Sequence, residues 1–174
     1  IPAVVVSKAG TVLAFAEARK HSRSETGDIH LVLRRSTDGG RTWGDIITVW
    51  DDAGNVCGNP APVVDRETGR ILLLSTWNDG TDHEKDIHAR TAKDTRRVFV
   101  LYSDDDGLTW SSPREITPSV KREDWTWYAT GPCHAIQLQK GRHKGRIVVS
   151  CNHGLFKDGK GAGSYSHLIY SDDH

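Results

Sequence analysis

The sequence predicts an all-β protein of the β-propeller class, in which this chain covers about three blades of four antiparallel strands each. An octapeptide of the form S-x-D-x-G-x-T-W occurs at residues 36–43 and again at residues 103–110. Ser171 and the two Asp residues that follow it begin a third copy at nearly the same spacing. A repeat of constant period indicates that one supersecondary unit recurs along the chain.

Each octapeptide has the composition of a turn between two antiparallel strands. Asp38 and Asp105 can accept hydrogen bonds from nearby backbone N–H groups, and Gly107 can adopt a positive φ at little cost. Trp43 and Trp110 offer apolar area to the strand that follows. We therefore expect the octapeptides to close hairpins and to take no part in chemistry.

Strand signals recur in step with the octapeptide and define three units. The expected strands are residues 2–6, 11–16, 28–35 and 45–50, then 60–65, 71–77, 97–102 and 113–117, then 132–138, 146–151 and 166–170. No useful length shows helical periodicity. Polar loops are expected at residues 17–27, 78–96 and 152–163. Because a propeller closes with four to eight blades, we expect residues 1–174 to be part of one propeller domain, truncated at both ends.

Composition excludes several classes of function. The formal net charge is zero, so nothing favours binding to nucleic acid or to an anionic membrane. No apolar stretch approaches the roughly 20 residues needed to span a bilayer. Cys57, Cys133 and Cys151 are expected to be buried small hydrophobic residues. The nine histidines show no metal-ligand spacing, so neither a metal nor another cofactor is expected.

Several motifs occur in a set order. Ile1-Pro2 is followed by a strand that ends in E-x-R, with Glu17 and Arg19, and then by the loop 24–28, the octapeptides and the segments 58–65 and 127–132. This ordered set resembles the sialidase (neuraminidase) superfamily, the exo-α-sialidases with a six-bladed propeller and Asp-box (BNR) repeats. The resemblance covers essentially the whole chain and implies that the octapeptides are Asp boxes.

The resemblance implies retaining hydrolysis of terminal sialic acid from glycoconjugates. In that family a neutral Tyr, activated by a Glu, is the nucleophile, three Arg bind the substrate carboxylate, and a loop carboxyl is the acid and base. The nucleophile, its partner and two of the Arg fall on later blades, and the first Arg would precede Ile1. This piece is therefore expected to be inactive and to need the rest of the propeller.

The resemblance also implies roles for residues that are present. Glu25 would be the catalytic acid and base, in place of the family's Asp, and Asp28 is the fallback. The additional methylene of Glu25 moves the proton by roughly 1 Å, a displacement that can cost about a hundredfold in rate. Arg19 and Asn59 would contact the sugar near its 4-position. Looser matches in the substrate pocket are Trp77, Asp79, Glu84 and Tyr128.

Each assignment has a structural alternative. Arg19 could serve only as an ion-pair partner of Glu17 or Glu25, and Tyr128 or Trp77 could be core aromatics. The whole protein could be a non-catalytic Asp-box propeller that binds a glycan or a protein, or a transglycosylating relative. The expected partner is a sialylated glycan, with no nucleic acid and no membrane span. Secretion or periplasmic export is favoured because such substrates are found there.

Overall fold

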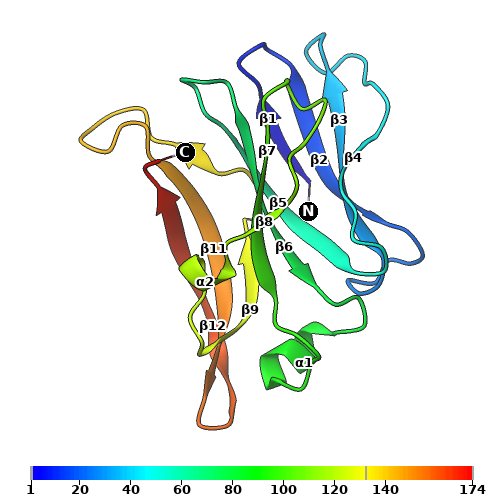
Figure 1. The fold of residues 1–174 in the computed structure, drawn as a ribbon, viewed down its shortest axis with the longest axis vertical. Helices are drawn as coiled ribbons and strands as arrows, with labels where there is room; N and C mark the ends of the chain where they lie inside the picture. The colour runs from blue at the N-terminus through cyan, green and yellow to red at the C-terminus, as the bar shows by residue number, and fades with distance from the viewer. Residues whose placement is uncertain (1, 132, 174) are drawn as a thin grey trace.

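The computed structural model describes residues 2–131 and 133–173 (Figure 1). This part of the chain is mostly β, as predicted. Its elements are β1 (Ala3–Val6), β2 (Val12–Arg19), β3 (Ile29–Ser36), β4 (Ile47–Trp50), β5 (Val56–Val64), β6 (Ile71–Asn78), α1 (Glu84–Ala89), β7 (Arg97–Ser103), β8 (Arg114–Glu115), α2 (Thr117–Val120), β9 (Trp125–Thr130), β10 (Ile136–Gln137), β11 (Ile147–Lys157) and β12 (Lys160–Ser171).

The strands form three antiparallel groups that follow one another along the chain. The first group is β1–β4 and the second is β5–β8, and a single parallel pairing of Ile29 with Val56 joins them into one sheet. In the third group β9 and β10 both pair with β11, and β12 pairs with the other edge of β11. Figure 1 shows the groups side by side, from blue and cyan through green to orange and red.

Strand β6 explains how the groups are held together. Ile71 and Leu73 lie in a hydrophobic core shared with the first group, whereas Leu72 and Leu74 lie in a second core shared with β9 and β11. Alternate side chains of a strand point to opposite faces, so a continuous apolar run fills both cores. Full burial of one such leucine stabilises the fold by roughly 1.5–3 kcal/mol.

The octapeptides close hairpins as predicted. The Asp38 Oδ1 atom accepts hydrogen bonds from the N–H groups of Arg41 and Thr42, both at 2.9 Å, and Oδ2 accepts the Thr42 hydroxyl at 2.6 Å. Asp105 accepts the N–H of Thr109 at 2.9 Å and its hydroxyl at 2.5 Å. These bonds, with the Thr hydroxyl bond foremost, lower the pKa of each Asp to about 2.

The third group differs most from the prediction. The expected loop at residues 152–163 is instead the end of a long hairpin of β11 and β12, which turns at Asp158 and Gly159, both with positive φ. Cross-strand pairing overrides the weak strand propensity of its glycines and lysines. The expected strand at 132–138 is reduced to β10, because Gly131 and Cys133 have positive φ. Strand β9, just before it, was not predicted.

Three smaller expectations need correction or lie outside the described residues. The helices α1 and α2 were not predicted because neither is long enough to show a helical period. Cys57 and Cys151 are buried as expected, but Cys133 is exposed. Predictions that fall on Ile1, Pro132 and His174 lie outside the described residues.

No helix in the described ranges is both long and apolar enough to cross a membrane.

Candidate functional site

The loop between β2 and β3 carries the residues that the E-x-R motif singled out. Because β3 runs from this loop to the first Asp box, the two features lie at opposite ends of the strand (Figure 1). Arg19 ends β2, and its guanidinium lies 3.2 Å from Glu17 Oε2 and 3.8 Å from Glu25 Oε1. It also donates to the carbonyl of Arg23 at 2.6 Å. Arg19 therefore lies between two carboxylates and fixes the loop that carries one of them.

Close packing of glycines sets the position of this loop. The N–H of Gly27 donates to the carbonyl of Gly80 at 2.7 Å. A Cβ atom on Gly80 would lie 1.8 Å from the carbonyl oxygen of Gly54. Only glycine allows the three backbone segments to approach this closely, so the loop after β6 helps to hold the loop of Glu25.

Glu17 joins the E-x-R motif to the G-N-P motif. Its side chain is 11% exposed, and Oε1 accepts the N–H of Asn59 at 2.9 Å. A Cβ atom on Gly58 would lie only 2.8 Å from the same oxygen, so the glycine is needed for this approach. Asn59 itself adopts a positive φ of 53°. Two motifs that are distant in sequence thus meet through one partly buried carboxylate.

Arg96 organises the base of the site. Its guanidinium donates to Asn59 Oδ1 at 2.5 Å, to the carbonyl of Tyr128 at 3.2 Å and to Asn78 Oδ1. It also lies 4.1 Å from the ring centroid of Trp127. Arg96 is 4% exposed, and burial lowers its pKa to about 10, so it remains positively charged at neutral pH.

These residues surround two adjoining hollows. The inner one, of about 110 Å³, is lined by Glu17, Arg19, Glu25, Ile29, Val56, Asn59, Arg96 and Trp127. The outer one, of about 470 Å³, is lined by Ser24, Glu25, Thr26, Asp82, His83, Glu84, Lys85, His88 and Trp127. Glu25 and Trp127 line both. The inner hollow is smaller than usual ligand pockets, but the outer one is within their range.

A larger hollow of about 550 Å³ lies elsewhere and is lined by β1, the end of β5 and residues 134–137. It presents Lys8, Arg66 and His134 but no carboxyl group. We place the candidate active site at the hollows that Glu25 lines, because the inner one brings together Arg19, Glu25 and Asn59.

The structure brings four of the predicted residues to these hollows: Arg19, Glu25, Asn59 and Glu84. Glu84 is the first residue of α1 and lies 3.4 Å from His88. Glu25 is the most accessible of them, with a side chain that is 71% exposed. A proton donor must be reachable by a glycosidic oxygen, and Glu25 meets that requirement.

The other predicted residues lie outside both hollows. Trp77 donates from Nε1 to Asp52 at 2.6 Å and packs on the first core. Asp79 accepts the N–H and the hydroxyl of Thr81, at 2.8 and 2.6 Å, and shapes its own turn. Tyr128 is fully buried and its hydroxyl lies 3.0 Å from His167 Nε2. Burial raises the pKa of Tyr128. In the described residues these three side chains contact the core or their own turn and do not line either hollow.

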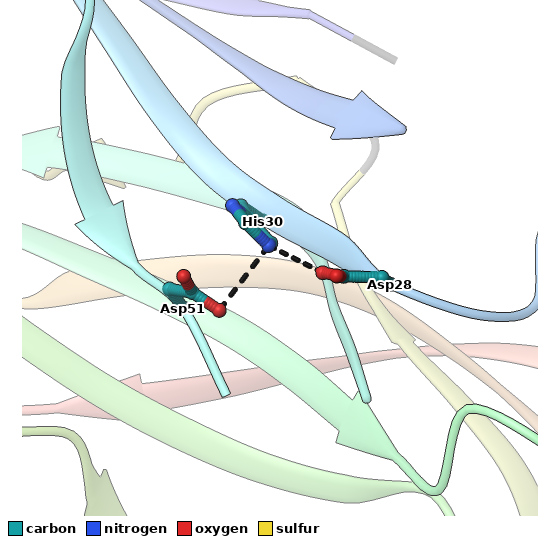
Figure 2. A group of neighbouring side chains, drawn as sticks. All are labelled: Asp28, His30 and Asp51. Carbon is teal, nitrogen blue, oxygen red and sulfur yellow. Dashed lines mark hydrogen bonds and ion pairs between the residues drawn. The ribbon is translucent and has the colours of Figure 1, made fainter. Parts of the chain in front are cut away.

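Asp28, the fallback acid, also lies apart from the hollows. Its carboxylate lies 3.0 Å from Lys20 Nζ. It also contacts His30, which in turn lies 3.2 Å from Asp51 (Figure 2). The hydrogen bond from Lys20 lowers the pKa of Asp28. A carboxyl that is held ionised is a poor proton donor, which argues against Asp28 in that role.

Arg96 and Trp127 were not assigned to the site from the sequence. Arg96 directly precedes β7 and lies two residues before the buried Val98, so strand alternation gave only a weak signal that its side chain faces inward. The signal for Trp127 was weaker, because the resemblance assigned only its neighbour Tyr128 to the substrate pocket. The alternation of β9 places Tyr128 in the core and Trp127 at the hollow.

Comparison with known proteins gives a consistent result. The domain family described as BNR repeat-like domain matches residues 10–174. An exo-alpha-sialidase of Aspergillus fumigatus is 35% identical over 158 residues, covering 81% of this chain and 39% of that protein. Sialidase-3 of Homo sapiens is 35% identical over 152 residues, covering 82% of this chain and 35% of that protein.

Comparison with a solved structure points to the same family. The Hadza microbial sialidase Hz136 superposes with a TM-score of 0.84 at 27% identity, over 99% of this chain and 35% of that one. The chain thus spans about two fifths or less of the length of these relatives. On the match of residues 10–174, the chain belongs to the sialidase family with a BNR repeat-like domain.

Proposed function

We propose that the protein is an exo-α-sialidase that removes terminal sialic acid from glycoconjugates with retention, and that this chain supplies part of its active site. One observation carries the proposal most directly. The guanidinium of Arg19 and the carboxyl of Glu25 lie 3.8 Å apart, and both line one hollow with Asn59. A cation for the sugar and an exposed acid for the glycosidic oxygen thus stand side by side.

The proposed roles follow from the contacts. Glu25 protonates the leaving oxygen and later accepts a proton from water. Arg19 and Asn59 bind the sugar, and Glu84 lines the outer part of the pocket. Glu17 and Arg96 are positioning residues, because they hold Arg19 and Asn59 from beneath. The three antiparallel groups would be blades of a six-bladed ring, whose other blades supply the nucleophile and the remaining Arg residues.

The carboxylate of the proposed substrate needs positive charge beyond that of the inner hollow. Sialic acid is an anion, and binding its carboxylate calls for charge-assisted bonds from Arg. Within the inner hollow Glu17 and Glu25 balance Arg19 and Arg96. The positive charge for the substrate carboxylate must therefore come from elsewhere in the whole protein. Secretion or periplasmic export of that protein remains part of the proposal, since sialoglycans are found outside the cell.

A second candidate is a non-catalytic propeller that binds a sialoglycan. It is favoured by one feature of Glu25: the side chain is 71% exposed and its ion-pair contact with Arg19 is long, at 3.8 Å. Catalytic side chains are usually held by close neighbours. A binding protein would not need a fixed proton donor at this position.

The test is hydrolysis of sialyllactose and of a fluorogenic aryl sialoside by the full-length protein. We expect Glu25→Gln to lower kcat/KM on sialyllactose by roughly 10²–10⁴-fold, and less on the aryl sialoside, whose leaving group needs little protonation. Glu25→Asp should keep or raise the rate. Glu67→Gln, at an exposed turn outside both hollows, is the matched control.

The outcomes separate the two candidates. If Glu25→Gln hydrolyses sialyllactose at the wild-type rate, Glu25 is not the acid. If the wild-type protein binds sialyllactose without turning it over, the protein is a glycan-binding propeller. A loss of equal size on both substrates would indicate disturbed binding rather than lost proton transfer.

A further inference from the structure

Asp28, His30 and Asp51 form a compact cluster (Figure 2), and Asp28 lies at the base of the loop that carries Glu25. Asp28 immediately precedes β3, His30 is the second residue of β3, and Asp51 immediately follows β4. One oxygen of each carboxylate and the Nε2 atom of His30 all lie within 4.8 Å of one another. His30 Nε2 lies 3.2 Å from Asp51 Oδ1 and in contact with Asp28 Oδ1.

The fold determines this arrangement in advance of any ligand. Asp28 and His30 are two residues apart, so their side chains share one face of the strand. The antiparallel pairing of Leu31 with Trp50 brings Asp51 opposite His30. Asp51 Oδ1 also accepts the N–H of Ala53 at 2.9 Å, which fixes that carboxylate. The side chains of Asp28 and His30 are only 12% and 16% exposed.

The donor set has the chemistry of a transition-metal site. Zinc binds imidazole nitrogen at about 2.0–2.1 Å and carboxylate oxygen at about 2.0–2.2 Å in tetrahedral geometry, which places neighbouring ligand atoms roughly 3.3–3.5 Å apart. The 3.2 Å separation of His30 Nε2 and Asp51 Oδ1 is close to this spacing. Calcium and magnesium prefer oxygen ligands alone, so the imidazole at the centre of the cluster selects against them.

A second histidine is within reach. His21 Nε2 lies 3.9 Å from Asp28 Oδ2, and its side chain is 73% exposed. Lys20 occupies Asp28 Oδ2 at 3.0 Å, which leaves Oδ1 directed at His30. We propose that Asp28, His30 and Asp51, with His21 as fourth ligand, form a site for a divalent transition-metal ion such as zinc. The histidine spacing in the sequence did not reveal it, because the ligands meet only through strand pairing.

The position of the cluster gives the site a consequence. Lys20 N–H donates to the carbonyl of Asp28 at 3.1 Å, so these residues form the base of the loop that carries Glu25. An ion bound to His21, Asp28 and Asp51 would connect the two ends of this loop to the end of β4. Metal binding would therefore reduce the opening of the loop without touching Glu25 or Arg19. The binding site itself does not depend on the proposed sialidase activity.

The test is titration of the chelator-treated, desalted protein with zinc chloride, followed by isothermal calorimetry and by competition with a chromophoric chelator. We expect one zinc ion per chain. His30→Gln and Asp51→Asn should each weaken binding by at least about tenfold. His83→Ala, an exposed histidine outside the cluster, should leave the affinity unchanged. Lys20→Gln should leave binding intact or tighten it, because it removes a positive charge beside Asp28.

Further readouts keep the result interpretable. Melting of each variant without metal identifies any that fail to fold, and the exposed His21→Ala variant is the least disruptive of them. Zinc should slow amide exchange in residues 20–28, and calcium should not. Equal zinc affinity in the wild type and in the His21, His30 and Asp51 variants would overturn the proposal. So would the absence of binding at millimolar zinc, or calcium binding as tight as that of zinc.

Discussion

The Asp-box turns differ in construction from the opposite end of the sheets, here called the loop end, where Glu17, Asn59 and Arg96 meet. At the first turn, the Asp38 carboxylate bonds only to residues at most four positions away in the sequence. At the loop end, Glu17 bonds to Asn59 across 42 positions and Arg96 bonds to Asn59 across 37. The bonds that close this turn therefore come from its own octapeptide, although in the second octapeptide Asp106 also bonds to the distant Thr11 and Arg35. The candidate site exists only when distant strands have already assembled.

The largest effect of this difference should appear on removal of Arg96. Its guanidinium is buried and donates to Asn59, to Asn78 and to the carbonyl of Tyr128. Arg96→Ala removes these bonds and leaves the buried Asn78 Oδ1 without its Arg96 donor, whereas Asn59 Oδ1 keeps the hydroxyl of Thr76. It should lower the free energy of unfolding by about 1–3 kcal/mol. Urea denaturation monitored by tryptophan fluorescence measures the change.

The neighbouring Arg97 is the matched control. Its side chain is 38% exposed and pairs with Asp94 and Glu115 at the surface. Exposed ion pairs contribute roughly 0–1 kcal/mol, so Arg97→Ala should have a small effect. Similar losses in the two variants would mean that the buried network does not organise the loop end.

A smaller effect should separate the partly buried histidines of β11 and β12, His153 and His167, from the Asp-box turns by pH. Burial lowers the pKa of His167 to about 4 and also lowers that of His153. The unfolded chain therefore binds more protons than the folded one between the ordinary histidine pKa of about 6.5 and 4. Stability should fall as the pH falls through this window. The Asp-box carboxylates, with a pKa of about 2, should cause a further loss only between about pH 4 and 2.

Chemical denaturation at a series of pH values measures both windows. His167→Gln should flatten the dependence between pH 6.5 and 4, whereas Asp105→Asn should flatten part of it below pH 4. If Asp105→Asn instead flattened the dependence between pH 6.5 and 4, and His167→Gln flattened it below pH 4, the pKa shifts described here would be contradicted. A single loss of stability below pH 4 that neither variant alters would do the same.

The same contrast between local and long-range contacts explains which parts of the structure the sequence predicts. Strands β2, β3, β6 and β7 were predicted within a few residues, because alternation and octapeptides are local signals. Arg19, Glu25 and Asn59 were placed together by resemblance, and the structure brings them to one hollow. The roles of Arg96 and Trp127 depend on long-range pairing and strand facing. Neighbouring residues in the sequence carry little of that information.

The third group illustrates the limit. Residues 152–163 are rich in Gly and Lys and were expected to be a loop, but β11 and β12 continue through them as a hairpin. A pairing partner determines strand formation more than composition does. The sequence did not indicate the cluster of Asp28, His30 and Asp51 for a related reason. Asp51 reaches His30 only through the pairing of β3 with β4.

The most direct test of the central claim is a crystal structure of the full-length protein with sialic acid bound. Our account predicts the sugar at the hollow lined by Arg19, Glu25 and Asn59, with the guanidinium of Arg19 and the amide of Asn59 within about 2.7–3.2 Å of its oxygens. Sialic acid bound elsewhere on the protein, with Arg19 and Glu25 facing only each other and solvent, would contradict it.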